Sequence, residues 1–266
     1  MKTLLISYFV LATAIFLISC SSSSDSIVQE IDYFPLSIGN YWIYKTYDIN
    51  QDSTAITGTE VKDSIAITGT REIQGQTAFI FQYSRQNDTG YVPIDTLYFY
   101  KDGKAVYQLL NEKNTKIPQL SDFWFKIAEF IDEYDNTYHT SLQNYYINFK
   151  DSSVASFADF ILNSKYIYSE RIPVLSSALP SRLFYLKNDR RFSFNYKFAD
   201  TTITVNRTML MRQKIWFGEY TGMAQIVNDP YYIKTAPENP DDYKYYQPDY
   251  QPVNGTKSEL LRMSVK

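Results

Sequence analysis

The chain has 266 residues, of which 44% are hydrophobic and 17% aromatic, and its formal net charge is −3 at pH 7. This length supports one large domain or two small ones, and the acidic balance provides no basic field for binding nucleic acid. The single cysteine, Cys20, excludes an intrachain disulfide, so the folded part must depend on packing.

The first predicted element is a cleaved signal peptide over residues 1–19. Lys2 supplies a positive start, and the apolar run over 4–18 is shorter than the roughly 20 residues of a membrane-spanning helix. The run ends in Leu17-Ile18-Ser19-Cys20, which resembles the lipobox of bacterial lipoproteins. The resemblance implies that the thiol of Cys20 receives a diacylglyceryl group, and acyl chains add about 0.8 kcal/mol of membrane binding per buried methylene.

Residues 20–32 are predicted to form a flexible tether between this anchor and the folded domain. They begin with the polar run Ser21-Ser22-Ser23-Ser24, which is typical of a flexible linker. In lipoproteins an Asp after the modified cysteine favours retention in the inner membrane, so Ser21 implies sorting to the outer membrane, on its periplasmic or surface face. The alternative is an ordinary secretory signal that leaves Cys20 as a free thiol, which exported proteins tend to avoid.

The segment over 33–44 predicts an entry turn followed by a first strand. Pro35 stiffens the chain, and Gly39-Asn40 is typical of a chain reversal. We expect Trp42 to enter the core from this strand, and a role as a ligand-stacking platform is the alternative.

Two hairpins are predicted in the N-terminal half. Gln74-Gly75 separates strand-like residues 65–73 from 78–83, and Asp102-Gly103 separates 97–100 from 105–107. Such short links, with a glycine that tolerates positive φ, make neighbouring strands antiparallel.

The middle of the chain predicts two short helices, over 121–131 and 153–162. Ser121 is a candidate N-cap of the first, and Asn163 is a candidate stop of the second. We expect both to cover a sheet face or plug a barrel end. The apolar residues at helical spacing are Phe123, Ile127, Phe130 and Ile131 in the first segment and Val154, Phe157, Ala158 and Ile161 in the second.

Alternation of apolar and polar residues is clearest over 191–198 and 201–217, which predicts two strands with one face on the core. Ala199-Asp200 is predicted to join them, and Asn188-Asp189 to separate 191–198 from an earlier strand. Arg207 and Gln213 interrupt the apolar face of the second strand and predict bends or bulges.

Residues 229–252 contain five prolines and several tyrosines. Proline at this density is not compatible with a central strand, so this segment predicts a long exposed loop. Its tyrosines, over 231–250, either pack the loop onto its own domain or form a contact surface, because tyrosine combines a large apolar face with a polar tip.

Taken together, the elements predict a mainly β fold, built as a curved antiparallel sheet or an incomplete β-barrel or sandwich with one or two short covering helices. We expect residues 33–266 to form a single domain. Its strand groups, over roughly 33–110 and 165–266, flank the helical segments.

Two stretches resemble a family of uncharacterised bacterial extracytoplasmic lipoproteins. Residues 33–44 (YFPLSIGNYWIY) match the family's opening pattern Y-x-P-L-x-x-G-N-x-W-x-Y. Residues 220–226 (YTGMAQI) and 258–261 (SELL) are similar to its closing pattern G-x-G-x-I…E-L, although Ala224 stands where the second glycine belongs. The resemblance implies a mainly antiparallel β fold outside the cytoplasm and implies no particular activity.

Residue types that carry catalysis or bind metals are scarce. A zinc site is excluded because His139 is the one histidine and Cys20 is expected to be lipidated, and a Ser-His-Asp arrangement would have to use this same histidine, which we expect in a polar connector. No G-x-S-x-G elbow or G-x-G-x-x-G loop occurs. The cluster of Glu129, Asp132, Glu133, Asp135 and Asn136 lacks the spacing of a calcium loop and indicates a solvated helix end.

These observations predict a membrane-anchored extracytoplasmic lipoprotein that binds a partner or supports a structure without catalysis or a cofactor. We expect its partners to be the membrane, through lipidated Cys20, and a hydrophobic or glycan ligand. The alternative function is a surface glycan hydrolase, which needs only two suitably separated carboxylates.

Overall fold

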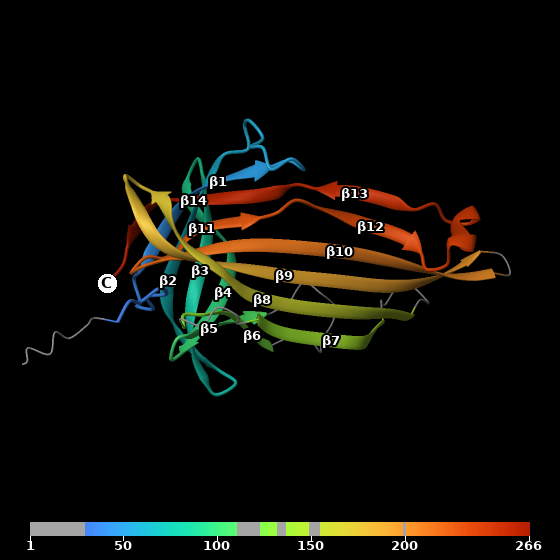
Figure 1. Cartoon of the computed structure of the whole chain (residues 1–266), viewed down its shortest axis with the longest axis horizontal. Coiled ribbons are helices and arrows are strands. Elements are labelled where there is room, and N and C mark those ends of the chain that lie inside the picture. Colours follow the sequence, from blue (N-terminus) through green and yellow to red (C-terminus); the bar gives the residue numbers. More distant parts are fainter. Residues whose placement is uncertain (1–29, 111–122, 132–136, 149–154, 199–200) are drawn as a thin grey trace, which may run out of the picture. The chain divides into compact units, whose positions relative to one another are not determined.

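The alternating segments of the sequence form one large antiparallel sheet in the computed structural model of the protein (Figure 1). The structure describes residues 30–110, 123–131, 137–148, 155–198 and 201–266. Within them, residues 32–266 form one compact unit. The strands are β1 (Tyr41–Ile49), β2 (Val61–Ile73), β3 (Gln76–Asn87), β4 (Gly90–Asp102), β5 (Ala105–Leu110), β6 (Phe123–Glu129), β7 (Thr137–Asn148), β8 (Ala155–Val174), β9 (Ser177–Phe198), β10 (Thr201–Gly218), β11 (Gly222–Asn228), β12 (Tyr231–Pro237), β13 (Asp249–Val253) and β14 (Gly255–Ser264).

The strand order is β6-β5-β4-β3-β2-β1-β14-β11-β10-β9-β8-β7. The order contains two meanders, one from the N-terminal strands and one from the C-terminal strands, and β1 joins them by pairing with β14. The long strand β10 pairs with β11 and then with β12, while β13 pairs with β12 and β14 with β11. The sheet is curled, so β6 comes to lie beside β8 and β9 (Figure 1).

Two hairpins confirm the turns predicted from glycine. Gln74 and Gly75 have φ values of 52° and 76° between β2 and β3, and Gly103 has a φ of 56° between β4 and β5. Phe198 and Thr201 are paired across β9 and β10, as the alternating pattern predicts, whereas Ala199-Asp200 lies outside the described residues. The break predicted at Asn188-Asp189 is wrong: β9 continues through it, because β8 and β10 pair with it on both sides.

The two predicted helices are also wrong where the structure describes them. Residues 123–129 form β6, which pairs with β5, and residues 155–162 belong to β8, which pairs with β7 and β9. Short apolar segments fit either period, and pairing with strands distant in the sequence decides between them. The one described helix is a 3₁₀ turn, η2 (Pro240–Lys244), which the side chain of Asn239 caps by accepting from the Asp241 N–H.

The long loop predicted over 229–252 is instead a pair of strands joined by η2. Proline is tolerated because of where it falls: Pro237 ends β12, and Pro252 lies in β13, which pairs with β12 alone among the described strands. Tyr232 and Tyr250 of these strands are exposed, and the Lys234 ammonium lies 5.7 Å from the ring centroid of Tyr250. The structure therefore shows an ordered tyrosine-bearing surface, and its role as a contact surface stays a prediction.

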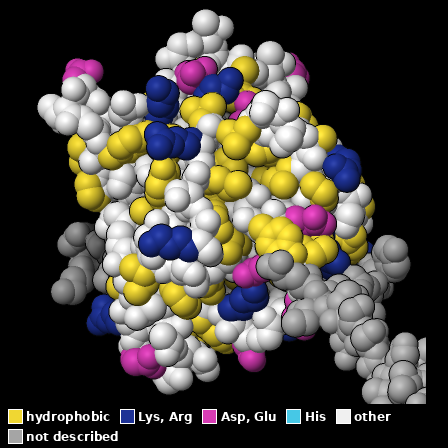
Figure 2. All heavy atoms as spheres, turned by 90° about the vertical axis from the view of Figure 1, so that its left-hand side faces the viewer, with side chains coloured by type: hydrophobic (Ala, Val, Ile, Leu, Met, Phe, Trp, Pro, Cys, Tyr) yellow, Lys and Arg dark blue, Asp and Glu magenta, His cyan; other side chains and the backbone are white. Residues whose placement is uncertain are grey.

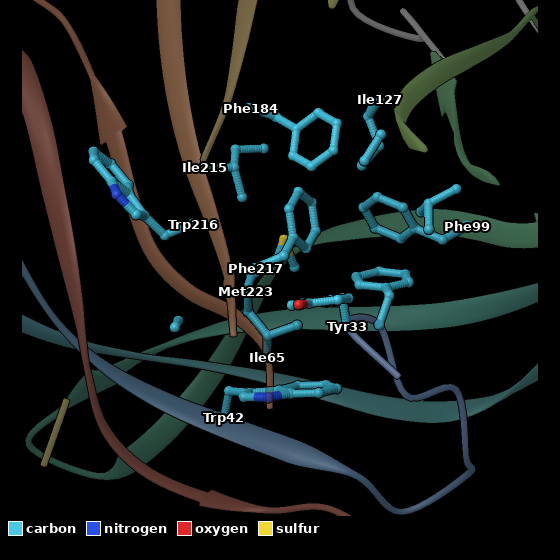
Figure 3. Close-up of a cluster of buried hydrophobic side chains, with 14 of the residues drawn as sticks. Tyr33, Trp42, Ile65, Phe99, Ile127, Phe184, Ile215, Trp216, Phe217 and Met223 are labelled. Atoms are coloured by element: carbon cyan, nitrogen blue, oxygen red, sulfur yellow. The ribbon is translucent and has the colours of Figure 1, made fainter. Parts of the chain in front are cut away.

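The core lies on the inner face of the curl. Phe99 of β4, Ile127 of β6, and Phe184 and Phe217 of β9 and β10 point into the same space (Figure 3). The predicted burial of Trp42 is confirmed, and its indole N–H donates to the carbonyl of Thr221. A buried ring cannot serve as a stacking platform, so Trp42 is a core residue.

Candidate functional site

A cavity of about 360 Å³ opens on the inner face of the sheet beside this core. Its walls come from β5 and β6 on one side and from β8 to β12 on the other, so it lies where the curl brings the two meanders together. Its lining residues are Gln108, Leu110, Phe125, Leu162, Leu186, Lys187, Asn188, Met211, Arg212, Gln213, Asn228, Asp229 and Tyr231.

Strand alternation explains the apolar part of the lining. Leu186 lies two residues from buried Phe184 on β9, and Met211 lies four residues from buried Ile215 on β10. Residues separated by an even number share one face of a strand, so these side chains continue the core face toward the cavity. The apolar face predicted for 201–217 is confirmed by the burial of Ile203, Val205, Ile215 and Phe217.

Polar side chains cross the same inner face as a ladder. The amide of Gln213 donates to the Asn228 side-chain oxygen over 2.8 Å, and the Asn228 amide donates to the Thr256 hydroxyl over 2.8 Å. The pairing register of β10 is continuous at Arg207 and Gln213, so neither predicted position is a bulge, and the register with β11 shifts at Trp216/Phe217 instead. Gln213 breaks the apolar pattern because it belongs to this ladder of hydrogen-bonded side chains.

Two of the charged residues that line the cavity, Arg212 and Asp229, form ion pairs. Lys214 lies 2.8 Å and 3.0 Å from the two carboxylate oxygens of Asp229, and Arg212 forms an ion pair with Asp189. Among the described residues that line the cavity, Asp229 is the one acid. The described wall therefore does not supply two carboxylates for hydrolysis.

A second polar cluster lies on the inner face of β1, β2 and β3. The carboxylate of Asp63 accepts from the Arg85 Nε over 2.9 Å and from the Tyr83 hydroxyl over 2.6 Å. The Thr46 hydroxyl also contacts Asp63 and lies 2.9 Å from the Ser258 hydroxyl. Ser258 is two residues along β14 from Thr256, where the ladder ends. Polar groups thus continue from the cavity across β14 and β1.

The pKa values of this cluster follow from burial and from these hydrogen bonds. Burial by itself would raise the pKa of Asp63, but the donors on Arg85, Tyr83 and Thr46 outweigh it and hold that pKa below its ordinary value. Burial, together with the Asp63 charge, raises the pKa of Tyr83 to about 12. The cluster therefore holds a permanent carboxylate–guanidinium pair near neutral pH and offers no group that titrates there.

Two solved structures are similar to the chain at low identity. A predicted lipoprotein from Parabacteroides distasonis is 11% identical, and the match covers 88% of this chain and 99% of that one with a TM-score of 0.45. A predicted exported protein with a YmcC-like fold from Bacteroides fragilis is 10% identical, with 88% and 100% coverage and a TM-score of 0.38. No protein-family model matches the sequence, and no curated protein matches it.

The remaining predicted site residues are not brought together. Cys20 and residues 132–136 lie outside the described part of the chain, and Glu129 contacts Lys126 at 3.1 Å. His139 lies in β7, opposite Asn163 of β8, rather than in a connector. In the part of the chain that the structure describes, no three His, Cys, Asp or Glu residues gather as metal ligands. Among the described residues, no helix has the length and the apolar composition that crossing a membrane requires.

The cavity itself was not predicted from the sequence. Its walls combine Leu110 and Phe125 with Leu186 and Met211, which are some 60 to 100 positions apart in the chain. The one local signal was Gln213, a polar residue on an otherwise apolar strand face.

Proposed function

We propose that the protein is an extracytoplasmic lipoprotein, anchored in the outer membrane through Cys20, which binds an amphipathic hydrophobic ligand without catalysis. The cavity between β5–β6 and β8–β12 is the observation that carries this proposal. Its volume falls within the range of about 300–1,000 Å³ that is common for small-molecule sites.

The distribution of side chains favours a ligand with an apolar body and a polar end. Leu110, Phe125 and Met211 can surround an acyl or ring system, while the amide ladder of Gln213 and Asn228 borders the same space. A purely polar glycan would leave the apolar wall without a partner. Its hydroxyl groups would also be buried against that wall without hydrogen bonds, which is unfavourable. For the second candidate, glycan hydrolysis, the described residues provide no supporting observation.

Filling the cavity tests the proposal. In Met211→Trp, the larger side chain occupies ligand space, so we expect the affinity for the fluorescent probe N-phenyl-1-naphthylamine to fall by about tenfold or more. The measurement is a fluorescence titration of the chain from Ser21 onward, which contains the whole compact unit 32–266.

The adjacent residue supplies a matched control. Leu210 is 48% exposed on the opposite face of β10, so Leu210→Trp makes a similar change outside the cavity and should bind the probe like the wild type. Equal affinities of the Met211 and Leu210 variants would contradict a ligand site in this cavity. A separate measurement, mass spectrometry of wild-type protein purified without detergent, would identify any ligand that remains bound.

A further inference from the structure

Two turns at one end of the sheet expose a hydrophobic residue in a conformation that hydrophobic residues rarely adopt. Leu175, between β8 and β9, has a φ of 55° and is 57% exposed, and Tyr220, between β10 and β11, has a φ of 51° and is 42% exposed. In the described residues, the other non-glycine positions with positive φ are the polar Ser53 and Gln74.

Neither the backbone conformation nor the exposure to water favours a leucine or a tyrosine at these two positions. The left-handed region favours Gly or Asn, because a bulkier L-residue brings its Cβ close to the following carbonyl. Leu175 and Tyr220 also keep about half of their surface in water, which is unfavourable for apolar groups. A strained and exposed residue of this kind points to a function.

The two turns belong to the same end of the domain as the start of β1. The Glu219 N–H donates to the Pro180 carbonyl over 3.0 Å, which places the β10–β11 turn beside the start of β9. The ring of Trp42 lies against Gly222, so the same turn also lies beside the start of β1, where Ile38 is 55% exposed. Hydrophobic side chains cover much of this end in the space-filling view (Figure 2). We call Ile38, Leu175 and Tyr220 the turn-tip surface.

The chain enters the domain at this end. The Tyr220 N–H donates to the carbonyl of Asp32 over 2.7 Å, and Asp32 is the first residue of the compact unit. Cys20 precedes it by twelve positions, and such a segment spans at most about 40 Å when fully extended. A lipid on Cys20 therefore keeps Asp32, and the turn next to it, within that distance of a bilayer.

We propose that the turn-tip surface is a second contact with the membrane, made by the protein itself and seated in the lipid bilayer that carries the Cys20 anchor. Leu175 and Ile38 would enter the boundary between headgroups and acyl chains, and Tyr220 suits this boundary because its ring is apolar and its hydroxyl can stay in water. The contact would hold the domain in one orientation on the membrane, which a lipid at a single residue does not do. It rests on the proposed Cys20 anchor for the choice of bilayer, and it is independent of the cavity and of what the cavity binds.

Vesicle flotation of the chain from Ser21 onward tests the contact without the anchor. With vesicles of phosphatidylethanolamine and phosphatidylglycerol, we expect wild-type protein to float, and the double variant Leu175→Asn, Tyr220→Asn to partition about tenfold less, because binding scales with buried apolar area. Asparagine is well tolerated at positive φ, so thermal unfolding of this variant should match or exceed that of the wild type.

Leu210→Asn is the matched control, since it removes an exposed leucine from the middle of β10 and should float like the wild type. Leu175→Trp adds a second readout: its fluorescence should shift to the blue with vesicles, while that of Leu210→Trp should not. Flotation of the double variant equal to that of the wild type, or no shift at Leu175→Trp, would overturn the proposal. Loss of a protein partner with unchanged flotation would assign this surface to that partner instead.

Discussion

The carboxylate of Asp63 is held at the inner face of the sheet, where its side chain is 1% exposed. A buried charge is costly unless it is paired and hydrogen-bonded. Arg85 supplies two donors, Nε at 2.9 Å and Nη2 at 3.3 Å, and Tyr83 supplies a third at 2.6 Å. Asp63 of β2 and its donors on β3 thus form a cluster in which the buried charge is paired and hydrogen-bonded.

Removing the charge should destabilise the fold in a pH-dependent way. Asp63→Asn leaves Arg85 without its counter-charge, and we expect the free energy of unfolding to fall by about 2 kcal/mol at pH 7, moderated because the guanidinium is half exposed. The pKa of Asp63 is lowered in the folded state, so its stabilisation is present above the unfolded pKa and is lost as the pH falls through the folded value. Urea unfolding at pH 7 and pH 3 measures this: the difference between the two proteins should begin to shrink as the pH falls below the ordinary Asp pKa of about 3.9, and should vanish only below the lowered folded-state pKa. A constant difference at both pH values would show that the carboxylate charge is not responsible.

Among the strands, the connection between β11 and β12 packs against the connection between β13 and β14. β11 passes into β12 at Asp229-Pro230, and β13 passes into β14 at Asn254. A Cβ on Gly255 would lie 2.3 Å from the Asn228 carbonyl oxygen and 2.7 Å from the Pro230 nitrogen. Both contacts are backbone atoms, which cannot rotate away, so only glycine allows the two chains to approach this closely.

Gly255→Ala should therefore lower the free energy of unfolding by about 3 kcal/mol, the upper range of overpacking effects. Gly69→Ala is the control, because it also lies in a strand but its Cβ would meet only Ile80 Cδ1, at an ordinary 3.8 Å. Its effect should be small, and it could be stabilising, since glycine costs chain entropy in a strand. Chemical unfolding of both variants gives the comparison, and similar losses would rule out the close approach as the cause.

At the scale of the whole molecule, one residue outside the sheet joins the two meanders. The ring of Phe34 lies 5.7 Å from that of Phe81 and 5.6 Å from that of Phe99, on β3 and β4, and 5.8 Å from that of Phe217 on β10. These distances are typical of favourable aromatic pairs. The entry segment therefore joins the two meanders from within the curl.

Phe34→Ala should cost about 3–5 kcal/mol in unfolding free energy, as a large buried aromatic leaves a cavity behind. The exposed Leu261, replaced by alanine, should change stability by less than about 0.5 kcal/mol. Thermal unfolding followed by circular dichroism measures both. A small effect at Phe34 would show that the sheet curls without this residue.

The predicted anchor is tested on the whole chain in its host membrane. Cys20→Ala removes the acceptor thiol, so we expect loss of palmitate labelling and loss of signal-peptide cleavage ahead of residue 20. Wild-type protein should remain with the outer-membrane fraction after a high-salt wash. An unlabelled wild-type protein that is released by that wash would contradict the lipid anchor.

Local residue patterns were enough to predict the strand faces and turns that depend on neighbouring residues. Alternation placed Ile203, Val205 and Phe217 on the core side, and glycine at 75 and 103 marked hairpins, because side-chain direction and positive φ are local properties. Three features could be recognised only from the folded chain: residues 123–129 and 155–162 are strands, Gln213 belongs to a polar ladder, and a cavity lies between the meanders. These features depend on strands paired or packed across long sequence distances, and the energy of such contacts leaves no periodic pattern in the local sequence.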